Sequence, residues 1–491
     1  MNKFLDALTN ETNYTLTANG GLAHKTTRSA LLDMFAESAA YRNRSDVDCI
    51  NLFKNAYLEN PEYALKCLFY TRAVREGQGE RRYFRVVMNW LASYDIEAAR
   101  RNMQFIPELG RWDDLFCLFG TNLQKDALDL ITEQLKLDVM CKTPSLLAKW
   151  LPSENASSHK TKALARLVRG HLGWTARQYR KTLTILRARI NVLERLMSQN
   201  RWDEIEFDKI PSKAGFKYRN AFARRDIIKE KYAQFMRSAD TKVNAGTLYP
   251  YECVAEARKL SSYFGRDSVE RTAINKYWDN LNDYFNNASF DGMAVVDVSG
   301  SMYGNEAAAP INVAISLGLY CADKARGPFA NHFITFSSNP DLVQVRGSDF
   351  CEKVWNMGKA DWGMNTNLES VFKLLLDTAI RNNLAQHDLP NRLIIISDMQ
   401  IDAATCNYRY GSSVDTMMES MRKHWAAMGY EMPKLVYWNV NASKTAFLDN
   451  DPNVTYISGF SPVVFEQLMT GKTGYELMME VLNKPCFADI K

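Results

Sequence analysis

The pattern of apolar and polar residues changes near residue 288. From Ser29 to about residue 285, apolar residues recur at three- and four-residue spacing, in stretches such as EYALKCLFYTRAVRE and RYFRVVMNWLASY. This spacing predicts successive amphipathic helices joined by short connectors. Such a series, with no strand signal, predicts an α-solenoid of stacked helix pairs whose repeats are degenerate. Residues 1–28 are polar and predict a loop with a turn at TANGG, residues 17–21.

The clearest predicted helix spans residues 175–198. Its apolar positions follow a 4-3-4-3-4 spacing and fall on one narrow face; they are Tyr179, Leu183, Leu186, Ile190, Leu193 and Met197. The basic residues Arg177, Arg180, Lys181 and Arg187 lie off that face. They therefore point towards solvent or a partner.

After the turn-rich segment 286–292, short apolar runs alternate with helical stretches. MAVVDVS, HFITFS, RLIIIS and KLVYWNV are typical of buried strands, and PINVAISLGLYCADKA and NLESVFKLLLDTAIRNN are typical of helices. This alternation predicts a doubly wound, mainly parallel sheet. Because single cores stop growing at about 250–300 residues, we predict two domains, a helical one over 1–287 and an α/β one over 288–491.

Oxygen-bearing side chains follow two of the predicted strands. Asp297, Ser299 and Ser301 form D-x-S-x-S after the first strand, and RLIIIS is followed directly by Asp398. In open α/β sheets, ligands bind beyond the carboxyl ends of the strands. One carboxylate and two hydroxyls are hard donors that suit Mg²⁺, and Gly300 should ease the turn between the serines. The alternative is a strand followed by a plain Ser/Gly turn.

With Thr366 in WGMNTNLE, these residues resemble the metal-ion-dependent adhesion site of von Willebrand factor A domains. The resemblance implies a Rossmann-like von Willebrand A domain that binds Mg²⁺ or Mn²⁺. It also implies that Ser299, Ser301 and Thr366 contact the metal, directly or through water. Asp297 and Asp398 would then hold the coordinated waters.

Charge is distributed unevenly along the chain. The net charge of +5 combines 45 Lys and Arg against 34 Asp and Glu in residues 1–287 with 16 against 22 in residues 288–491. A basic first part indicates contact with a polyanion, although the two oppositely charged parts could instead attract each other. Residues 159–195 contain ten basic residues and one acid, Glu194. Lys and Arg neutralise phosphates, so this segment is the main candidate for nucleic-acid binding, and the alternative is a solvated helix face.

The predicted RNA-binding residues lie in two clusters. They are Lys160, Lys162, Arg166, Arg169, Arg177, Arg180, Lys181 and Arg187 in the first, and Lys213, Lys217 and Arg219 in the second. The aromatic rings of Trp174 and Tyr179 lie among the first set, but Tyr179 fits the apolar stripe and is predicted to be core.

A further group of arginines lies in RAVREGQGERR, residues 72–82, around Gly77 and Gly79. Arg72, Arg75, Arg81 and Arg82 could contact phosphate at a helix N-terminus, and a plain helix–helix turn is the equal alternative. LGRWDDLF, residues 109–116, is predicted to be structural. In that motif Trp112 would pack, and Asp113 and Asp114 would cap a helix.

Several motifs together resemble the Ro-related proteins built on the TROVE module, above all their uncharacterised branch with a C-terminal von Willebrand A domain. These motifs are RAVREGQGERRYF, LGRWDDLF, NAGTLYPYECV and DVSGSM with WGMNTN. The resemblance implies HEAT-like helical repeats that form a ring closed by that domain. It also implies a ribonucleoprotein role, with binding of single-stranded RNA ends or small structured RNA, as a scaffold or a quality-control chaperone.

Several classes of protein do not fit the sequence. No apolar run reaches the ~18 residues of a membrane span, and the N-terminus has no signal-peptide core. Nine dispersed cysteines without a C-x-x-C pair argue against disulfides and zinc and indicate a reducing cytoplasm. Without a base beside a nucleophile or a carboxylate cluster, we predict no enzyme. The remaining alternative to RNA binding is a metal-dependent adhesion module for protein partners.

Overall fold

The computed structural model describes residues 13–17, 20, 22–260, 265, 267–304, 306, 308–336, 339–358, 367–400, 417–442, 447–448, 451, 454–469 and 471–491. Packing divides the chain into two compact units. The first joins Met1–Cys67 to Ala245–Ala488, and the second joins Leu68–Asn244 to Asp489–Lys491. The boundaries of these packing units differ from the predicted domain boundary at 287/288. That domain boundary therefore stays a prediction.

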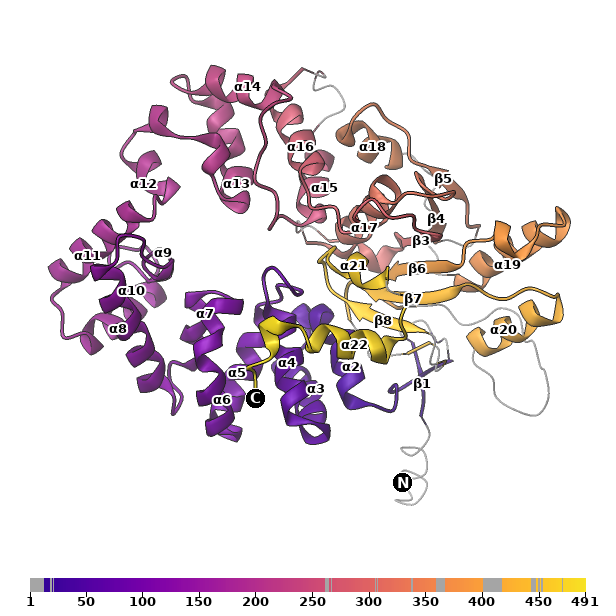
Figure 1. Cartoon of the computed structure of the whole chain (residues 1–491), viewed down its shortest axis with the longest axis horizontal. Helices are drawn as coiled ribbons and strands as arrows, with labels where there is room; N and C mark the ends of the chain where they lie inside the picture. The colour runs from indigo at the N-terminus through magenta and orange to yellow at the C-terminus, as the bar shows by residue number, and fades with distance from the viewer. Residues whose placement is uncertain are drawn as a thin grey trace. The chain divides into compact units, whose positions relative to one another are not determined.

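The first unit contains a mixed sheet of six strands in the order β5-β4-β3-β6-β7-β8. The strands are β3 Gly292–Asp297, β4 His332–Phe336, β5 Leu342–Gln344, β6 Arg392–Ser397, β7 Lys434–Asn439 and β8 Thr455–Ser458. All neighbours are parallel except β4 and β5, which are antiparallel. The helical first part and the strand–helix second part predicted from the sequence are therefore confirmed (Figure 1).

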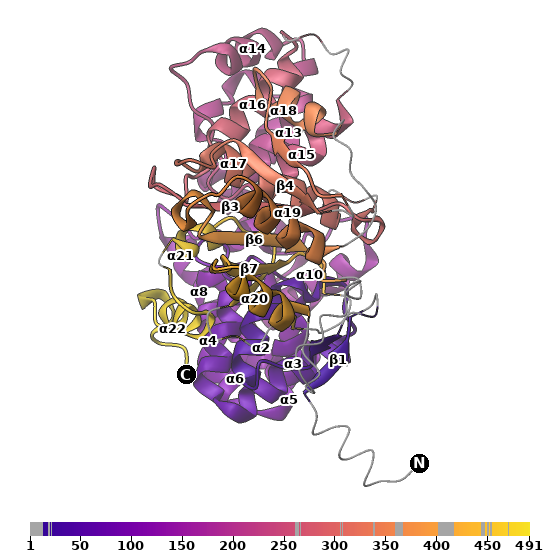
Figure 2. The ribbon, with the colours of Figure 1, turned by 90° about the vertical axis from the view of Figure 1, so that its right-hand side faces the viewer.

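Alternating residues of the central strands enter two cores, one on each face of the sheet. Val295 and Ile395 pack with Phe372 of α19 (Leu368–Arg381) and with the side chains of α20 (Met417–Ala427). Figure 2 views the sheet from the side of these two helices. On the other face, helix α17 (Pro310–Lys324) comes so close that a Cβ at Gly318 would lie 2.4 Å from Val296 Cγ2. Helices thus cover both faces, which explains why the strand sequences are continuously apolar.

The first unit also contains further helices from each of its two chain segments. They are α2 Ala30–Glu37, α3 Asp46–Glu59, α15 Pro250–Lys259, α16 Val269–Asp279, α18 Phe350–Met357, α21 Val464–Leu468 and α22 Gly474–Leu482. The loop predicted before Ser29 is wrong in part, because β1 (Tyr14–Leu16) and β2 (Leu22–His24) pair as an antiparallel hairpin. Of the predicted turn, the backbone N–H of Gly20 donates to the carbonyl of Thr17, and residues 18, 19 and 21 lie outside the described residues. His24 extends the pairing through reciprocal backbone hydrogen bonds with Phe447.

Between His24 and Gly292 the described residues form helices and turns but no strand. Helix α4 (Pro61–Arg72) crosses from the first unit into the second. The helices of the second unit are α5 Arg82–Tyr94, α6 Ile96–Asn102, α7 Ile106–Leu109, α8 Gln124–Met140, α9 Leu147–Trp150, α10 His159–His171, α11 Ala176–Arg189, α12 Leu193–Ser198, α13 Ser212–Arg224 and α14 Lys229–Arg237. None of the described helices is long and apolar enough to cross a membrane.

The single helix predicted over 175–198 is wrong, because it is two helices. Helix α11 ends at Arg189, and α12 begins only at Leu193. Asn191 between them has a φ of 48°, in the left-handed region that asparagine tolerates better than most residues. The apolar stripe continues across this break, so periodicity alone could not reveal it.

Candidate functional site

The carboxyl ends of β3 and β6 bring four of the five predicted metal-site residues together. Val296 and Ile396 are partners in the parallel register of the two strands, so Asp297 and Asp398 lie at the same edge. Both carboxylates are buried. The hydroxyl oxygens of Ser299 and Ser301 are 3.2 Å apart. Thr366 lies outside the described residues.

Hydrogen bonds fix the first carboxylate of this site. Asp297 Oδ1 accepts from the backbone N–H of Ser299 at 2.8 Å, and Asp297 Oδ2 accepts from the hydroxyl of Ser397. Sequence reasoning placed Ser397 at the strand end but did not include it in the site. Its position one residue before Asp398 was the available signal, since neighbouring parallel strands end side by side.

The Asp398 carboxylate is affected by its own burial and by the neighbouring Asp297 carboxylate. Burial, and then the negative charge of Asp297, raise the pKa of Asp398 to about 7, although a hydrogen bond from Ser301 opposes the shift. None of the groups that shift this pKa is a basic side chain. Two buried carboxylates that repel each other are costly, and a divalent cation beside the serine hydroxyls would neutralise them. The oxygen donors present therefore fit Mg²⁺ or Mn²⁺.

The turn at Gly300 and the set of possible metal ligands can both be compared with the structure. A Cβ at Gly300 would meet nothing within 4 Å, so the expected need for glycine in this turn is wrong. In the described part of the chain, no group of three or more His, Cys, Asp or Glu is arranged to hold a metal. Metal binding at Asp297 and Asp398 would therefore depend on the serine hydroxyls as well.

The first basic cluster divides into free and structural side chains. Lys160, Lys162 and Arg166 on α10, and Arg177 and Lys181 on α11, make no hydrogen bond or ion pair with the described residues; all but the half-buried Lys162 are exposed. We call these five side chains the basic face.

The other predicted residues of this cluster have protein partners. Arg169 pairs with Glu154 at 2.7 Å, and the exposed Arg180 lies 3.9 Å from the same carboxylate. Arg187 donates to the carbonyls of Ala148 and Leu151 and to the hydroxyl of Ser153. Its guanidinium therefore binds the end of α9 and the segment after it, and the side chain is half-buried.

The second basic cluster is less uniform than the sequence indicates. Lys213 and Lys217 are exposed, and the Lys217 ammonium lies 4.9 Å from the centroid of the Tyr218 ring. Arg219 is buried, donates to the carbonyl of Phe216 at 2.7 Å and lies over the Phe216 ring. The geometry gives Arg219 a packing role. Tyr179 is also buried, as predicted, and donates its hydroxyl to the carbonyl of Pro152.

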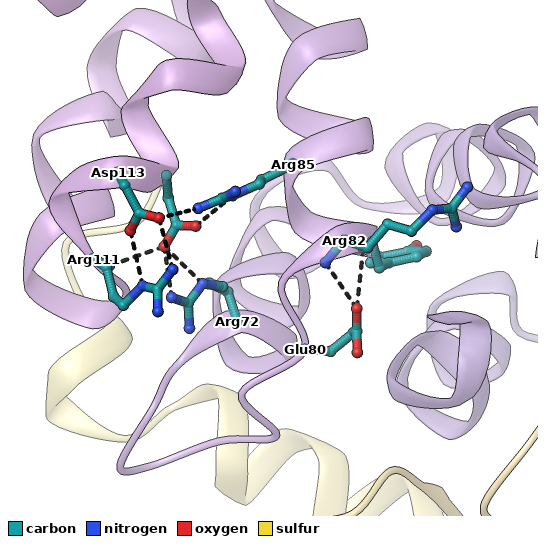
Figure 3. Close-up of polar contacts among 8 residues, drawn as sticks. Arg72, Glu80, Arg82, Arg85, Arg111 and Asp113 are labelled. Carbon is teal, nitrogen blue, oxygen red and sulfur yellow. Dashed lines mark hydrogen bonds and ion pairs between the residues drawn. The ribbon is translucent and has the colours of Figure 1, made fainter. Parts of the chain in front are cut away.

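Asp113 and Asp114, predicted to cap a helix, lie at the centre of an ion-pair network in the second unit (Figure 3). The buried Asp114 accepts from Arg72 Nε at 2.8 Å and Arg85 Nε at 2.7 Å. It also accepts from the backbone N–H of Arg111, so the capping role is present but secondary.

Asp113 shares Arg85 with Asp114 and also binds the side chain of Arg111. Arg85 donates to it at 2.8 Å, and Arg111 binds it through two nitrogens, Nε and Nη2. Burial alone would raise the pKa of Asp113, but the hydrogen bonds and charges of Arg111 and Arg85 outweigh burial and lower it. The network is close-packed, because a Cβ at Gly110 would lie 2.8 Å from Asp114 Oδ2.

The fold is similar to that of a protein of known structure. The crystal structure of the Deinococcus radiodurans Ro (RSR) protein matches with a TM-score of 0.51 at 12% sequence identity, over 91% of this chain and 100% of that chain. The chain thus has a Ro-like fold. It belongs to the family described as domain of unknown function DUF2828, which matches residues 17–108 and 112–289. Residues 291–484 match a second family, domain of unknown function DUF7788.

A viral relative is similar to most of the chain. The uncharacterized protein L728 of Acanthamoeba polyphaga mimivirus is 33% identical over 504 aligned positions, which cover 94% of this chain and 85% of that protein. The similarity therefore extends across both compact units.

Proposed function

We propose that this chain is an RNA-binding protein of the Ro type, which binds single-stranded ends or small structured RNA as a scaffold or quality-control chaperone. The observation that carries the proposal is the basic face, where five basic side chains of α10 and α11 have no partner among the described residues. The Ro-like fold supports it. On this proposal the helices are HEAT-like repeats and the sheet belongs to a von Willebrand A-like domain; closure into a ring stays a prediction.

Cations without a protein partner on two successive helices favour phosphate binding over simple solvation. Some surface lysines of the second unit pair with a neighbouring acid, as Lys209 does with Glu206 and Lys229 with Asp226. On the basic face no acid offsets the charge in this way. Phosphates would therefore gain attraction there without first displacing an internal ion pair.

Binding should weaken steeply with salt and tolerate changes of sequence. If about six phosphates are contacted, log affinity should fall against log salt with a slope near −4, using ~0.7 per phosphate for single strands. Fluorescence anisotropy of unrelated oligonucleotides between about 50 and about 300 mM salt measures the slope. A slope near zero, or no binding at low salt, would remove the proposal.

We further propose that Asp297, Ser299, Ser301, Thr366 and Asp398 hold Mg²⁺ or Mn²⁺. The buried, mutually repelling carboxylates support this part of the proposal. When bound, the ion would act as a Lewis acid and could bind an oxygen ligand of a partner molecule. Asp297, held by Ser299 and Ser397, would keep the donor set in place. We propose no catalytic reaction for the site.

Millimolar Mg²⁺ should raise the melting temperature of the chain, because the ion binds only the folded site. At about a hundred times Kd the stabilisation is about 2.7 kcal/mol. Asp297→Ala should abolish the shift, whereas Glu466→Gln, which removes an exposed carboxylate in the same unit, should retain it. Calorimetry with and without chelator measures both. An identical Mg²⁺ response in parent and Asp297→Ala would show that the ion binds elsewhere.

A metal-dependent adhesion module for protein partners is the second candidate, and the same carboxylates favour it. The two functions can be separated by repeating the RNA titration with chelator. RNA binding by the basic face should change less than about threefold, or about 0.7 kcal/mol. A protein partner that completes the metal shell with a carboxylate should be released.

A further inference from the structure

The ion-pair network of the second unit has more positive than negative charge. Arg72, Arg85 and Arg111 surround Asp113 and Asp114, and a fourth arginine, Arg81, lies at the start of α5. We call the four arginines the arginine cluster. Four guanidinium groups against two carboxylates leave two positive charges in excess.

Arg81 is the member of the cluster without a protein acceptor. Its side chain is exposed and makes no hydrogen bond or ion pair with the described residues. Partial burial, and then the charges of Arg111 and Arg85, lower the pKa of its guanidinium, although the charges of Asp113 and Asp114 act in the opposite direction. Arginine nevertheless stays protonated at neutral pH, so the repulsion persists in the folded protein.

The paired arginines also retain free donors. Arg85 uses Nε and Nη2 on the aspartates, and Arg111 uses the same two nitrogens on Asp113. This leaves Nη1 of each without a partner among the described residues. Neither side chain is fully buried, with 31% of Arg85 and 26% of Arg111 exposed. An anion beside Arg81 could reach these groups without breaking an existing ion pair.

A tryptophan ring and a buried carboxylate lie next to members of the arginine cluster. The Arg111 guanidinium is stacked 3.9 Å from the centroid of the Trp150 ring, and Lys149 adds a further cation 5.4 Å from the same ring. Glu80 is buried, and its carboxylate accepts from the backbone N–H groups of Arg82 and Tyr83, as Figure 3 shows for Arg82. Glu80 thereby occupies the N-terminus of α5, so the free donors in this region are guanidinium groups.

We propose that Arg81, Arg85 and Arg111 form a binding site for a phosphate monoester, with Asp113 and Asp114 as the anchors that orient the two inner arginines. The aspartates hold Arg85 and Arg111 rigidly, so a ligand does not have to order them. Planar guanidinium forks match the oxygens of phosphate. This site is separate from the basic face, and it goes beyond the general RNA binding proposed above.

The charge excess favours a monoester over a diester. A terminal phosphate carries about −1.5 to −2 charges at pH 7 and presents three terminal oxygens. A phosphodiester inside a strand carries one charge and presents two. The two surplus positive charges of the arginine cluster therefore match a terminal phosphate, either at the end of a strand or on a free mononucleotide or inorganic phosphate.

The test compares two short RNA oligonucleotides that differ only in a 5′-phosphate or 5′-hydroxyl and carry the same 3′ fluorophore. The parent chain should bind the phosphorylated strand about tenfold more tightly. Arg81→Gln should reduce this difference to less than about threefold, and Arg81→Lys should restore part of it. Arg75→Gln, which removes another exposed arginine of the same connector, should leave the difference unchanged.

Inorganic phosphate provides a readout that does not involve RNA. At constant ionic strength, phosphate should raise the melting temperature of the parent more than chloride does, and Arg81→Gln should lose this excess. Since Arg81 has no partner among the described residues, the variant should melt normally without phosphate. If inorganic phosphate abolishes the preference for the 5′-phosphorylated strand, the same site binds inorganic phosphate and the terminal phosphate of RNA.

The outcomes separate this proposal from the general one. Loss of all oligonucleotide binding on reversal of the basic face, with the phosphate-specific stabilisation kept, would support the site independently of RNA. Equal binding of both oligonucleotides by the parent, together with no specific stabilisation by phosphate, would overturn it. So would a parent-like preference in Arg81→Gln.

Discussion

Asp114→Asn should be the most destabilising single substitution in the helical unit, by about 3–5 kcal/mol. The Asp114 side chain is fully buried, and that of Arg72 is only 3% exposed. Removing the carboxylate charge leaves the Arg72 guanidinium buried without a counterion. The same change weakens the bond to Arg85, which also depends on this carboxylate. Loss of one partner from a buried pair costs far more than the pair contributes over a well-packed apolar replacement.

Chemical denaturation followed by circular dichroism measures this effect, because the second unit is mainly helical. Glu206→Gln, which breaks the exposed pair with Lys209, is the control and should leave the midpoint unchanged. Asp113→Asn should fall between the two, because its carboxylate is partly exposed. A midpoint for Asp114→Asn equal to that of the control would mean that the network does not stabilise the fold.

The sequence predicted the sheet because its strands are buried on both faces. MAVVD and RLIIIS are continuous apolar runs, and the structure pairs them in parallel with Asp297 and Asp398 at a common edge. The end of a strand fixes the place of the next polar residue, so the carboxyl edge could be predicted from two short stretches. The part contributed by Ser397 depends on a contact across strands, which no local pattern encodes.

The direction of an arginine side chain was much harder to predict. Arg187 and Arg177 are both off the apolar stripe of their helix, yet Arg187 binds carbonyls 36 and 39 residues earlier in the chain and Arg177 has no partner among the described residues. Spacing gives the face of a helix but not the acceptors that other segments bring to it. The same reason explains Arg219, whose helix turns it onto Phe216.

The arginine cluster shows a second limit of local patterns. RAVREGQGERR and LGRWDDLF were interpreted separately, as a possible phosphate contact and as a helix cap. Their meaning changes once the fold joins them, because Asp114 lies 42 positions from Arg72 and 29 from Arg85. The dense packing at Gly110, where a side chain would meet Asp114, is likewise a tertiary constraint that the sequence does not reveal.

Reversing three charges on α11 should have the largest effect on RNA binding. In the variant with Arg177→Glu, Arg180→Glu and Lys181→Glu, the affinity for every RNA sequence should fall about 50-fold or more near 150 mM salt, and the salt slope should decrease by about 2. The three side chains are exposed, and the weak ion pair of Arg180 with Glu154 is the one internal interaction that the change disrupts among the described residues. The fold should therefore survive the change.

A matched variant separates this local effect from the change in net charge. Arg101→Glu, Lys125→Glu and Lys136→Glu reverse three exposed charges on α6 and α8 of the same unit, so both variants change the net charge by −6. If long-range attraction alone governs binding, the two variants should weaken it equally, and the difference from the parent should vanish at high salt. If the basic face binds phosphates, only the α11 variant should reduce the slope, because only that variant removes cations whose binding to phosphate releases counterions. If the α11 variant binds RNA as tightly as the parent does, the cations of this helix are solvated side chains that do not bind phosphate.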